Sequence, residues 1–138
     1  MAAQSGGGDV VTGSGKITVG DAVFEGPYSF ASRFEDGEGT NPEQLIAAAL
    51  AGCFTMALSN LLSVAGHPPG SLRTHAVVHL RNSDGEISLS RIHLDTTGHV
   101  PGLAQIEFQR YGAEAKANCP VSRALAGVPE ITLSAKLE

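Results

Sequence analysis

The longest regular pattern of hydrophobic positions lies between residues 40 and 66. From Leu45 to Leu58 the only polar side chain is Thr55. A helix that is apolar on every side is usually enclosed on every side. We therefore expect a central helix that the rest of the chain surrounds.

The ends of this helix are predicted from the residues that flank it. Thr40 as N-cap, with Glu43 reaching back to it three residues later, forms a capping box, and a proline is tolerated in a first helical turn. Gly66 offers a left-handed cap at the other end, and Pro68 follows it. The pattern thus predicts a helix that runs to Ala65.

Strict alternation of apolar and polar residues follows the helix. One side of residues 72–80 carries Leu72, Thr74, Ala76, Val78 and Leu80. This period of two is typical of a half-buried strand. Residues 82–85 have turn chemistry, and residues 86–97 run back as a second strand. A β-hairpin is predicted.

Weaker patterns complete an α+β fold with a mainly antiparallel sheet. We expect short strands at 16–20 and 23–30, with turns at 20–21 and 26–27, and a solvated loop at 34–39. Helices are predicted at 103–118 and from Cys119, and a last strand at 131–137. Residues 1–13, rich in glycine and serine, are expected to be a flexible segment before a single domain at 14–138.

Composition narrows the classes of function. The formal net charge is −5 and no basic run occurs, which argues against a nucleic-acid or membrane partner. The start of the chain lacks the features of a secretory signal, and the apolar stretch from Leu45 to Leu58 is short for a membrane span. We therefore expect a cytoplasmic protein, in which a permanent disulfide is rare but a transient catalytic one is not.

The two cysteines, Cys53 and Cys119, occupy different settings. Cys53 lies inside the apolar helix, where the simplest role is that of a small buried hydrophobe with a raised pKa. Its reactivity would need a cation from elsewhere in the fold. Cys119 precedes Pro120 and is expected to be the N-cap of a short helix, whose N–H groups favour a thiolate. Both readings remain open for each residue.

Other chemistry finds little support. His75 and His79 share a strand face but lie about 13 Å apart at the usual rise per residue. The chain has no CxxC or HExxH motif for zinc, no GxSxG elbow and no phosphate-binding loop. Arg33 and Glu43 taken alone are explained as a loop cation and a capping residue.

Several motifs, in order, closely resemble the osmotically inducible protein C (OsmC) family, with the related organic hydroperoxide resistance proteins as its sister branch. They are YSFASRFE at 28–35, GTNPEQLIAAA at 39–49, AGCFTMAL at 51–58, ANCPVS at 117–122 and EITL at 130–133. The valine after Cys119-Pro120 is typical of the OsmC branch, because the sister branch usually has an aromatic there. An Ala-x-Trp strand common in this branch is absent, which leaves the first strand unassigned.

The resemblance implies a fold, an activity and a site. The fold would be an intertwined homodimer in which mainly antiparallel sheets wrap central helices, with active sites at the subunit interface. The activity would be reduction of organic hydroperoxides, preferred over hydrogen peroxide, in stress defence. Cys53 would be the peroxidatic cysteine, Cys119 the resolving one, and Arg33 and Glu43 the pair that activates Cys53. No cofactor is implied, only an external dithiol such as a lipoyl group.

The residue types suit that chemistry. A Cys53 thiolate would attack the peroxide and become a sulfenic acid, and Cys119 would condense with it to a disulfide that the dithiol reopens. Arg33, held by Glu43 through a two-pronged pair, would supply the cation. Phe54 and Met56 would form apolar walls for a hydrocarbon tail.

Helix geometry adds a constraint of its own. Glu43 and Cys53 are ten residues apart, which is about 15 Å along a helix and roughly 80° around it. They cannot meet within one chain. Two copies of the helix crossing antiparallel near Ala48 would bring each Glu43 to the other copy's Cys53.

Two alternatives remain at this stage. The first is a general thiol–disulfide exchange protein without peroxide specificity. The second is a small-molecule- or zinc-binding module whose cysteines are structural.

Overall fold

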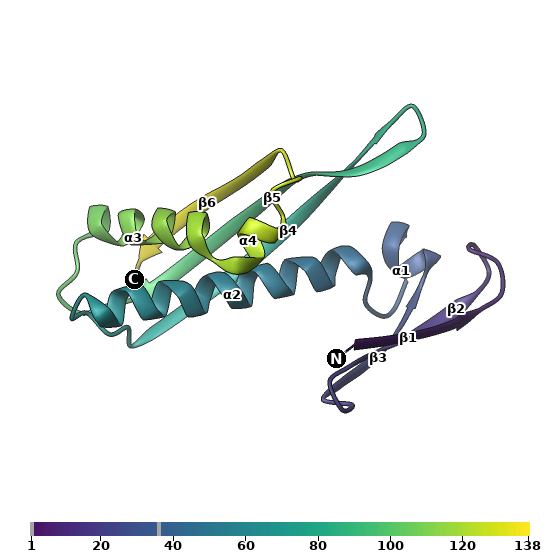
Figure 1. Ribbon diagram of the computed structural model, residues 1–138, viewed down its shortest axis with the longest axis horizontal. Coiled ribbons are helices and arrows are strands. Elements are labelled where there is room, and N and C mark those ends of the chain that lie inside the picture. The colour runs from purple at the N-terminus through teal and green to yellow at the C-terminus, as the bar shows by residue number, and fades with distance from the viewer. Residues whose placement is uncertain (1, 36) are drawn as a thin grey trace. The chain divides into compact units, whose positions relative to one another are not determined.

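The computed structural model describes residues 2–35 and 37–138. The chain forms two compact units, Met1–Leu45 and Ile46–Glu138, and each is described by itself. Each unit contains one three-stranded sheet (Figure 1). Among the described residues the fold is α+β, as predicted.

The first unit is an antiparallel sheet followed by a short helix. Strands β1 (Ala2–Gly7), β2 (Ser14–Val19) and β3 (Phe24–Ser29) pair in that order, and α1 (Phe30–Phe34) follows directly. Helix α1 was not predicted. Its cap is local: the Ser29 hydroxyl accepts the Ser32 N–H, and the Ser32 hydroxyl accepts the Ser29 N–H.

The first strand was not predicted, and one predicted turn is wrong. Residues 2–7 form β1, because its pairing with β2 uses backbone groups that small residues also carry. Gly26 and Pro27 lie inside β3 rather than in a turn. A proline is tolerated there because β3 is an edge strand. The turn at Gly20 is confirmed by its positive φ of 66°.

Helix α2 (Pro42–Val64) starts one residue later than predicted. The side chain of Asn41, not that of Thr40, accepts the N–H of Gln44 at 2.8 Å and so caps the helix. The predicted end is confirmed. Gly66 has a φ of +87°, and the N–H groups of Gly66 and His67 donate to the carbonyls of Ser63 and Leu62, which is a Schellman cap.

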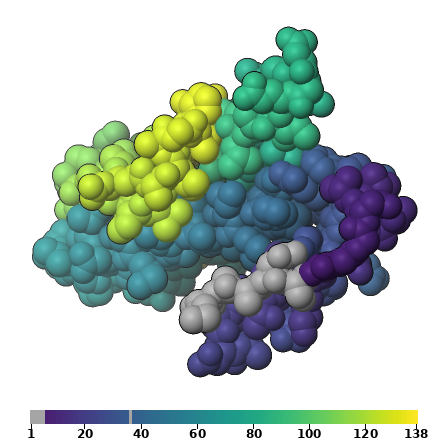
Figure 2. Space-filling view, turned by 45° about the vertical axis from the view of Figure 1, so that its right-hand side comes forward, coloured from purple at the N-terminus to yellow at the C-terminus, as the bar shows by residue number. Residues whose placement is uncertain are grey.

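The second unit contains the hairpin that the alternation predicted. Strands β4 (Ser71–Ser83) and β5 (Glu86–His99) are antiparallel, and β6 (Glu130–Leu137) joins β5 in parallel. The turn has positive φ at Asp84 and Gly85, and its tip projects beyond the rest of this unit (Figures 1 and 2). A register shift between His79 and Leu80 turns Leu80 outward, so its predicted inward orientation is wrong.

Two helices connect β5 to β6. Helix α3 (Gln105–Asn118) packs on β6, and α4 (Pro120–Ala124) follows after a single residue, Cys119. Close packing between β5 and α3 explains the glycine at position 98. An added Cβ would lie 2.8 Å from the ring of Phe108 on α3, which is too close for any side chain. The helix–sheet contact therefore requires glycine at this position.

The hydrophobic core contains one face of α2. Leu50, Phe54, Leu58 and Leu62 recur every four residues and are fully buried, together with Ile92 and Leu94 of β5 and Phe108 of α3. The opposite face of α2 is open. It carries Ala48, Ala49 and Gly52, and Met56 is 75% exposed. The expectation that this helix is enclosed on every side is therefore wrong for a single chain.

Among the described residues, α2 is also the one helix that is long and apolar enough, by length and composition, to cross a membrane. It extends beyond the apolar stretch at 45–58 that the sequence marked as short. Core helices of soluble proteins pass the same test. Here one face of α2 belongs to the hydrophobic core of the second unit.

Candidate active site

The two cysteines of the second unit come together. Cys53 lies in the middle of α2, and Cys119 is the residue between α3 and α4. Both are free thiols in the same hydrophobic cluster, and each affects the pKa of the other, so the two side chains lie near one another. Cys119 is 1% exposed, whereas Cys53 is only half-buried. Within one chain, Cys53 is therefore the sulfur that solvent reaches more readily.

Cys119 is the N-cap of α4, as the sequence predicted. Its sulfur accepts the backbone N–H of Ser122 at 3.3 Å, and its thiol donates to the Ser122 hydroxyl at 3.2 Å. Burial acts to raise the pKa of Cys119. Hydrogen bonds from the hydroxyl and backbone of Ser122, and from Cys53, outweigh burial and lower that pKa below its ordinary value. The fold thus favours a thiolate on Cys119.

Cys53 has the opposite tendency. The backbone N–H of Val121 is the largest single influence on the pKa of Cys53 and lowers it. Burial and the neighbouring Cys119 sulfur together raise the pKa above its ordinary value. Within one chain the low pKa therefore belongs to the more buried cysteine. A cation close to Cys53 would be needed to reverse this order.

The first unit contains an arginine that a carboxylate orients. The guanidinium of Arg33, on α1, grips the carboxylate of Glu43, on the first turn of α2, through Nε at 3.0 Å and through one terminal nitrogen at 2.6 Å. The face of the guanidinium lies 4.9 Å from the ring centre of Phe34. Glu43 thus holds the guanidinium through hydrogen bonds, and the Phe34 ring packs against it.

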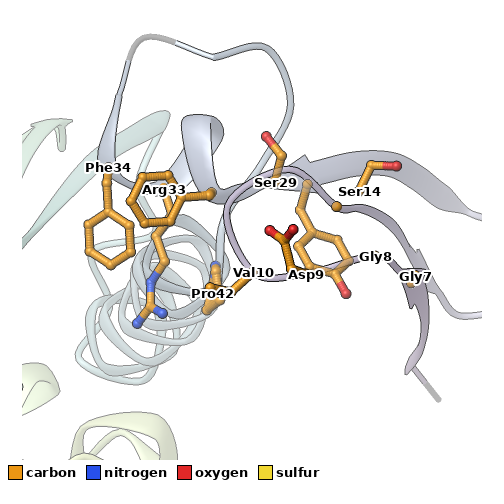
Figure 3. Close-up of a pocket in the computed structure, with 13 residues that line it drawn as sticks. Gly7, Gly8, Asp9, Val10, Ser14, Ser29, Arg33, Phe34 and Pro42 are labelled. Atoms are coloured by element: carbon orange, nitrogen blue, oxygen red, sulfur yellow. The ribbon is translucent and has the colours of Figure 1, made fainter.

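The surroundings of this ion pair are partly open. Glu43 is 9% exposed, and the Arg33 side chain is 37% exposed. Figure 3 shows Arg33 beside Phe34 and directed toward the start of α2 at Pro42, at the margin of a cavity of about 430 Å³. The amide of Asn41 donates to the carbonyl of Ser32 and so ties α1 to the helix start. The structure gives Glu43 an ion-pair role in place of the capping role that the sequence predicted.

The described contacts thus join the four predicted catalytic residues as two pairs, one in each compact unit. Of the two residues expected to form walls for substrate, Phe54 has no exposed surface. Position 54 lies on the core face of α2, and the role of Phe54 at the substrate stays a prediction. Met56 is on the open face, and its role stays a prediction.

Sequence reasoning missed two residues at the site. Ser122 was noted only as part of a motif, although its position three residues after an N-cap is where a side chain can reach back. Phe34 was assigned to a loop, because the short helix α1 has no strong helical pattern. Within the described residues, no group of three or more His, Cys, Asp or Glu side chains could hold a metal ion.

Comparison with known proteins gives consistent matches. Residues 35–134 match the model of the family described as OsmC-like protein. The chain is 42% identical over 132 residues to peroxiredoxin OsmC of Escherichia coli strain K12, which covers 95% of this chain and 91% of that protein. It is 33% identical over 102 residues to an organic hydroperoxide resistance protein of Xanthomonas axonopodis pv. citri, covering 71% and 68%.

Solved structures agree with the fold. The crystal structure of the organic hydroperoxide resistance protein OhrB of Bacillus subtilis has a TM-score of 0.74 and 25% identity, and the match covers 100% of this chain and 98% of that one. An organic hydroperoxide resistance protein from Elizabethkingia anophelis has a TM-score of 0.75 at 23% identity, covering 100% and 95%.

Proposed function

The chain belongs to the OsmC-like protein family, and from this premise we propose that it is a cysteine-based peroxidase that reduces organic hydroperoxides to alcohols. The observation that carries the proposal is that Cys53 on α2 and Cys119 before α4 pack in one cluster, near enough for each thiol to affect the pKa of the other. A structural cysteine needs no second cysteine beside it. A redox pair needs two cysteines that can form and break a disulfide.

The chemistry has two oxidative steps. The Cys53 thiolate attacks the terminal oxygen of the hydroperoxide, the O–O bond breaks, and the alkoxide takes a proton and leaves as an alcohol. Cys53 is now a sulfenic acid. The Cys119 thiolate attacks this sulfur and expels hydroxide, which leaves as water, so the disulfide forms before further oxidation. The lowered pKa of Cys119 supports this second step, since it favours the attacking form.

The first step needs a cation for Cys53, and we assign this role to Arg33 oriented by Glu43. Since Glu43 and Cys53 lie on one helix about 15 Å apart, they cannot serve the same site within one chain. The proposed enzyme is therefore a homodimer in which the Cys53–Cys119 pair of one subunit is served by the partner's Arg33 and the partner's Glu43.

The open face of α2 supports a dimer in which a second copy of the chain packs against this face. Ala48, Ala49 and Gly52 are exposed, and an added Cβ at Gly52 would meet nothing within 4 Å. Small residues allow two helix backbones to approach closely. A two-fold axis near Ala48 uses the same patch on both subunits, as an isologous contact requires. Reduction by an external dithiol such as a lipoyl group, and cytoplasmic localisation, also belong to the proposal.

The experiment is the mass of the reduced protein after one equivalent of cumene hydroperoxide. The expected product has lost two hydrogens, and a peptide map joins Cys53 to Cys119. Cys119→Ser should stop at a sulfenic acid on Cys53, and Cys53→Ser should remain unoxidised. A wild-type protein that keeps both thiols through this treatment would disprove the peroxidase.

A general thiol–disulfide exchange protein is the second candidate, because a lowered pKa at Cys119 also suits exchange with other disulfides. Stopped-flow loss of free thiol separates the two functions. A peroxidase reacts much faster with cumene hydroperoxide than with a small disulfide such as oxidised glutathione, and an exchange protein shows the reverse order.

A further inference from the structure

Ser122 contacts Cys119 in two ways and touches no other part of the proposed peroxide chemistry. Its backbone N–H donates to the Cys119 sulfur at 3.3 Å, and its hydroxyl lies 3.2 Å from the same sulfur. The residue is 8% exposed. A buried hydroxyl directed at one sulfur of a redox pair distinguishes that sulfur from the other.

We propose that Ser122 is a positioning residue that makes Cys119 the leaving thiolate when the Cys53–Cys119 disulfide is reduced, so that the reductant attacks Cys53. The inference deepens the proposed function, because it assigns the direction in which the same disulfide is reopened. It rests on that function only for the disulfide itself.

Access to the two sulfurs supports this direction. A thiolate that cleaves a disulfide must approach the attacked sulfur from the side opposite the departing sulfur. Cys119 is 1% exposed and enclosed at the junction of α3 and α4, whereas Cys53 is half-buried. Judged from the single chain, an external reductant therefore reaches Cys53 more readily than Cys119 and meets Cys119 as the departing atom.

Hydrogen bonding supports it independently. In the thiol form the Cys119 S–H donates to the Ser122 oxygen. Once Cys119 departs as a thiolate, the serine O–H can turn and donate to the sulfur, alongside the backbone N–H. Two donors then stabilise the negative charge, and Ser122 already helps to lower the pKa of Cys119. A thiol of lower pKa is the better leaving group.

The steps balance with a small dithiol as reductant. Its first thiolate forms a bond to Cys53 sulfur, the Cys53–Cys119 bond breaks, and Cys119 takes the electron pair. The second thiolate of the dithiol then attacks the reductant's own sulfur in the mixed disulfide and releases Cys53. Two electrons pass from the dithiol to the protein, and the dithiol becomes a cyclic disulfide.

A cation at Cys53 would act in the opposite sense. If the partner's Arg33 stabilises a Cys53 thiolate, it also makes Cys53 a better leaving group. Direction is then decided by competition between the guanidinium at one sulfur and Ser122 with burial at the other. The peroxide step therefore does not fix which sulfur of the disulfide the reductant attacks.

The first test maps the mixed disulfide that a monothiol leaves behind. The wild-type disulfide is made with diamide, so the test does not require peroxidase activity, and is exposed briefly to 2-mercaptoethanol. After acid quenching, free thiols are labelled with N-ethylmaleimide and peptides are analysed by mass spectrometry. The expected product carries mercaptoethanol on Cys53 and maleimide on Cys119. The reverse pattern would overturn the proposal, whether or not the chain reduces peroxides.

The second test measures the rate of that reduction in variants. Ser122→Ala should slow cleavage of the disulfide by 2-mercaptoethanol about threefold or more, and should move the pH midpoint of Cys119 alkylation in the reduced protein upward. Ser122→Thr, which keeps the hydroxyl, should restore much of both. Ser63→Ala, the same substitution at an exposed position of α2, is the matched control. Unchanged rate and midpoint in a folded Ser122→Ala protein would contradict the role of Ser122.

Discussion

The two compact units differ in what they bury. Every buried hydrophobic side chain of the described residues belongs to Ile46–Glu138, where α2, the sheet β4–β5–β6 and α3 share one core. In the other unit the buried described side chains are Ser32, Asn41 and Glu43, all polar. Several apolar residues of the first unit are exposed, with Val23 88% and Phe24 45% exposed.

This difference shows which unit is stable by itself. Below about 40 residues a segment usually needs disulfides, metals or oligomerisation to fold, and the first unit is only slightly longer. Among its described residues the first unit has hydrogen bonds and two ion pairs but no fully buried apolar side chain. We therefore expect its order to depend on surface supplied from outside it. The second unit holds its cysteines in a packed frame. In the proposed dimer, the unit without a core carries the cation and the unit with a core carries the sulfurs.

Removing a core side chain from the second unit should have the largest effect. Phe54→Ala deletes a fully buried ring and should lower the free energy of unfolding by about 3–5 kcal/mol. Val23→Ala in the first unit should change it by no more than about 0.5 kcal/mol. Urea denaturation measures both. Similar losses for the two variants would mean that the first unit has a core after all.

Breaking the Arg33–Glu43 ion pair of the first unit should affect chemistry in the second. Glu43→Gln removes the carboxylate that orients Arg33, and the rate of Cys53 oxidation by cumene hydroperoxide should fall about 10²-fold. Glu25→Gln, which removes the exposed partner of Lys16, is the matched control and should react normally. Stopped-flow measurement of the loss of free thiol follows both. Equal rates for Glu43→Gln and the wild type would mean that the Arg33–Glu43 pair does not assist the oxidation of Cys53.

The dependence of the first unit on a second copy predicts concentration-dependent stability. A tenfold increase in protein concentration should stabilise the folded dimer by about 1.4 kcal/mol. Calorimetric scans across a hundredfold range of concentration should therefore show a rising midpoint. A constant midpoint, together with a monomeric mass by light scattering, would contradict the proposed dimer on the open face of α2.

The helix that joins the two units should be sensitive to its cap. Asn41→Ala removes the acceptor of the Gln44 N–H and the donor to Ser32, and should cost about 1 kcal/mol of stability. Thr40→Ala should have a smaller effect, because Thr40 is not the N-cap. Thermal melts of the pair distinguish the observed cap from the one that the sequence predicted. A larger loss for Thr40→Ala would restore the original prediction.

The smallest effect is expected at the surface of the first unit. Lys16 and Glu25 form an exposed ion pair at 2.8 Å, and the pKa of Glu25 is lowered by its hydrogen bond and charge interaction with Lys16. Because solvent screens such pairs, Lys16→Met should leave the melting midpoint unchanged within error. A clear drop would show that the first unit depends on its surface charges more than its exposure suggests.

Strong local patterns identified most elements. The apolar run of α2, the alternation of β4, the turn at Asp84 and Gly85, and Pro120 after Cys119 each predict structure through contacts between near neighbours. Predictions failed where distant contacts decide. Residues 2–7 become a strand only through pairing with β2, and Leu80 turns outward because of an irregularity in the pairing of β4 with β5.

The sequence by itself determined the family, the two cysteines, the cap at Cys119 and the need for a cation beside Cys53, since these follow from residue types and short-range backbone chemistry. Only the tertiary structure decided that Cys53 and Cys119 meet, that Arg33 grips Glu43, that Ser122 contacts one sulfur of the two, and that α2 keeps one face open. The physical reason is that hydrogen bonds, ion pairs and burial act over a few ångströms in space, whereas these partners are separated along the chain or distinguished only by packing.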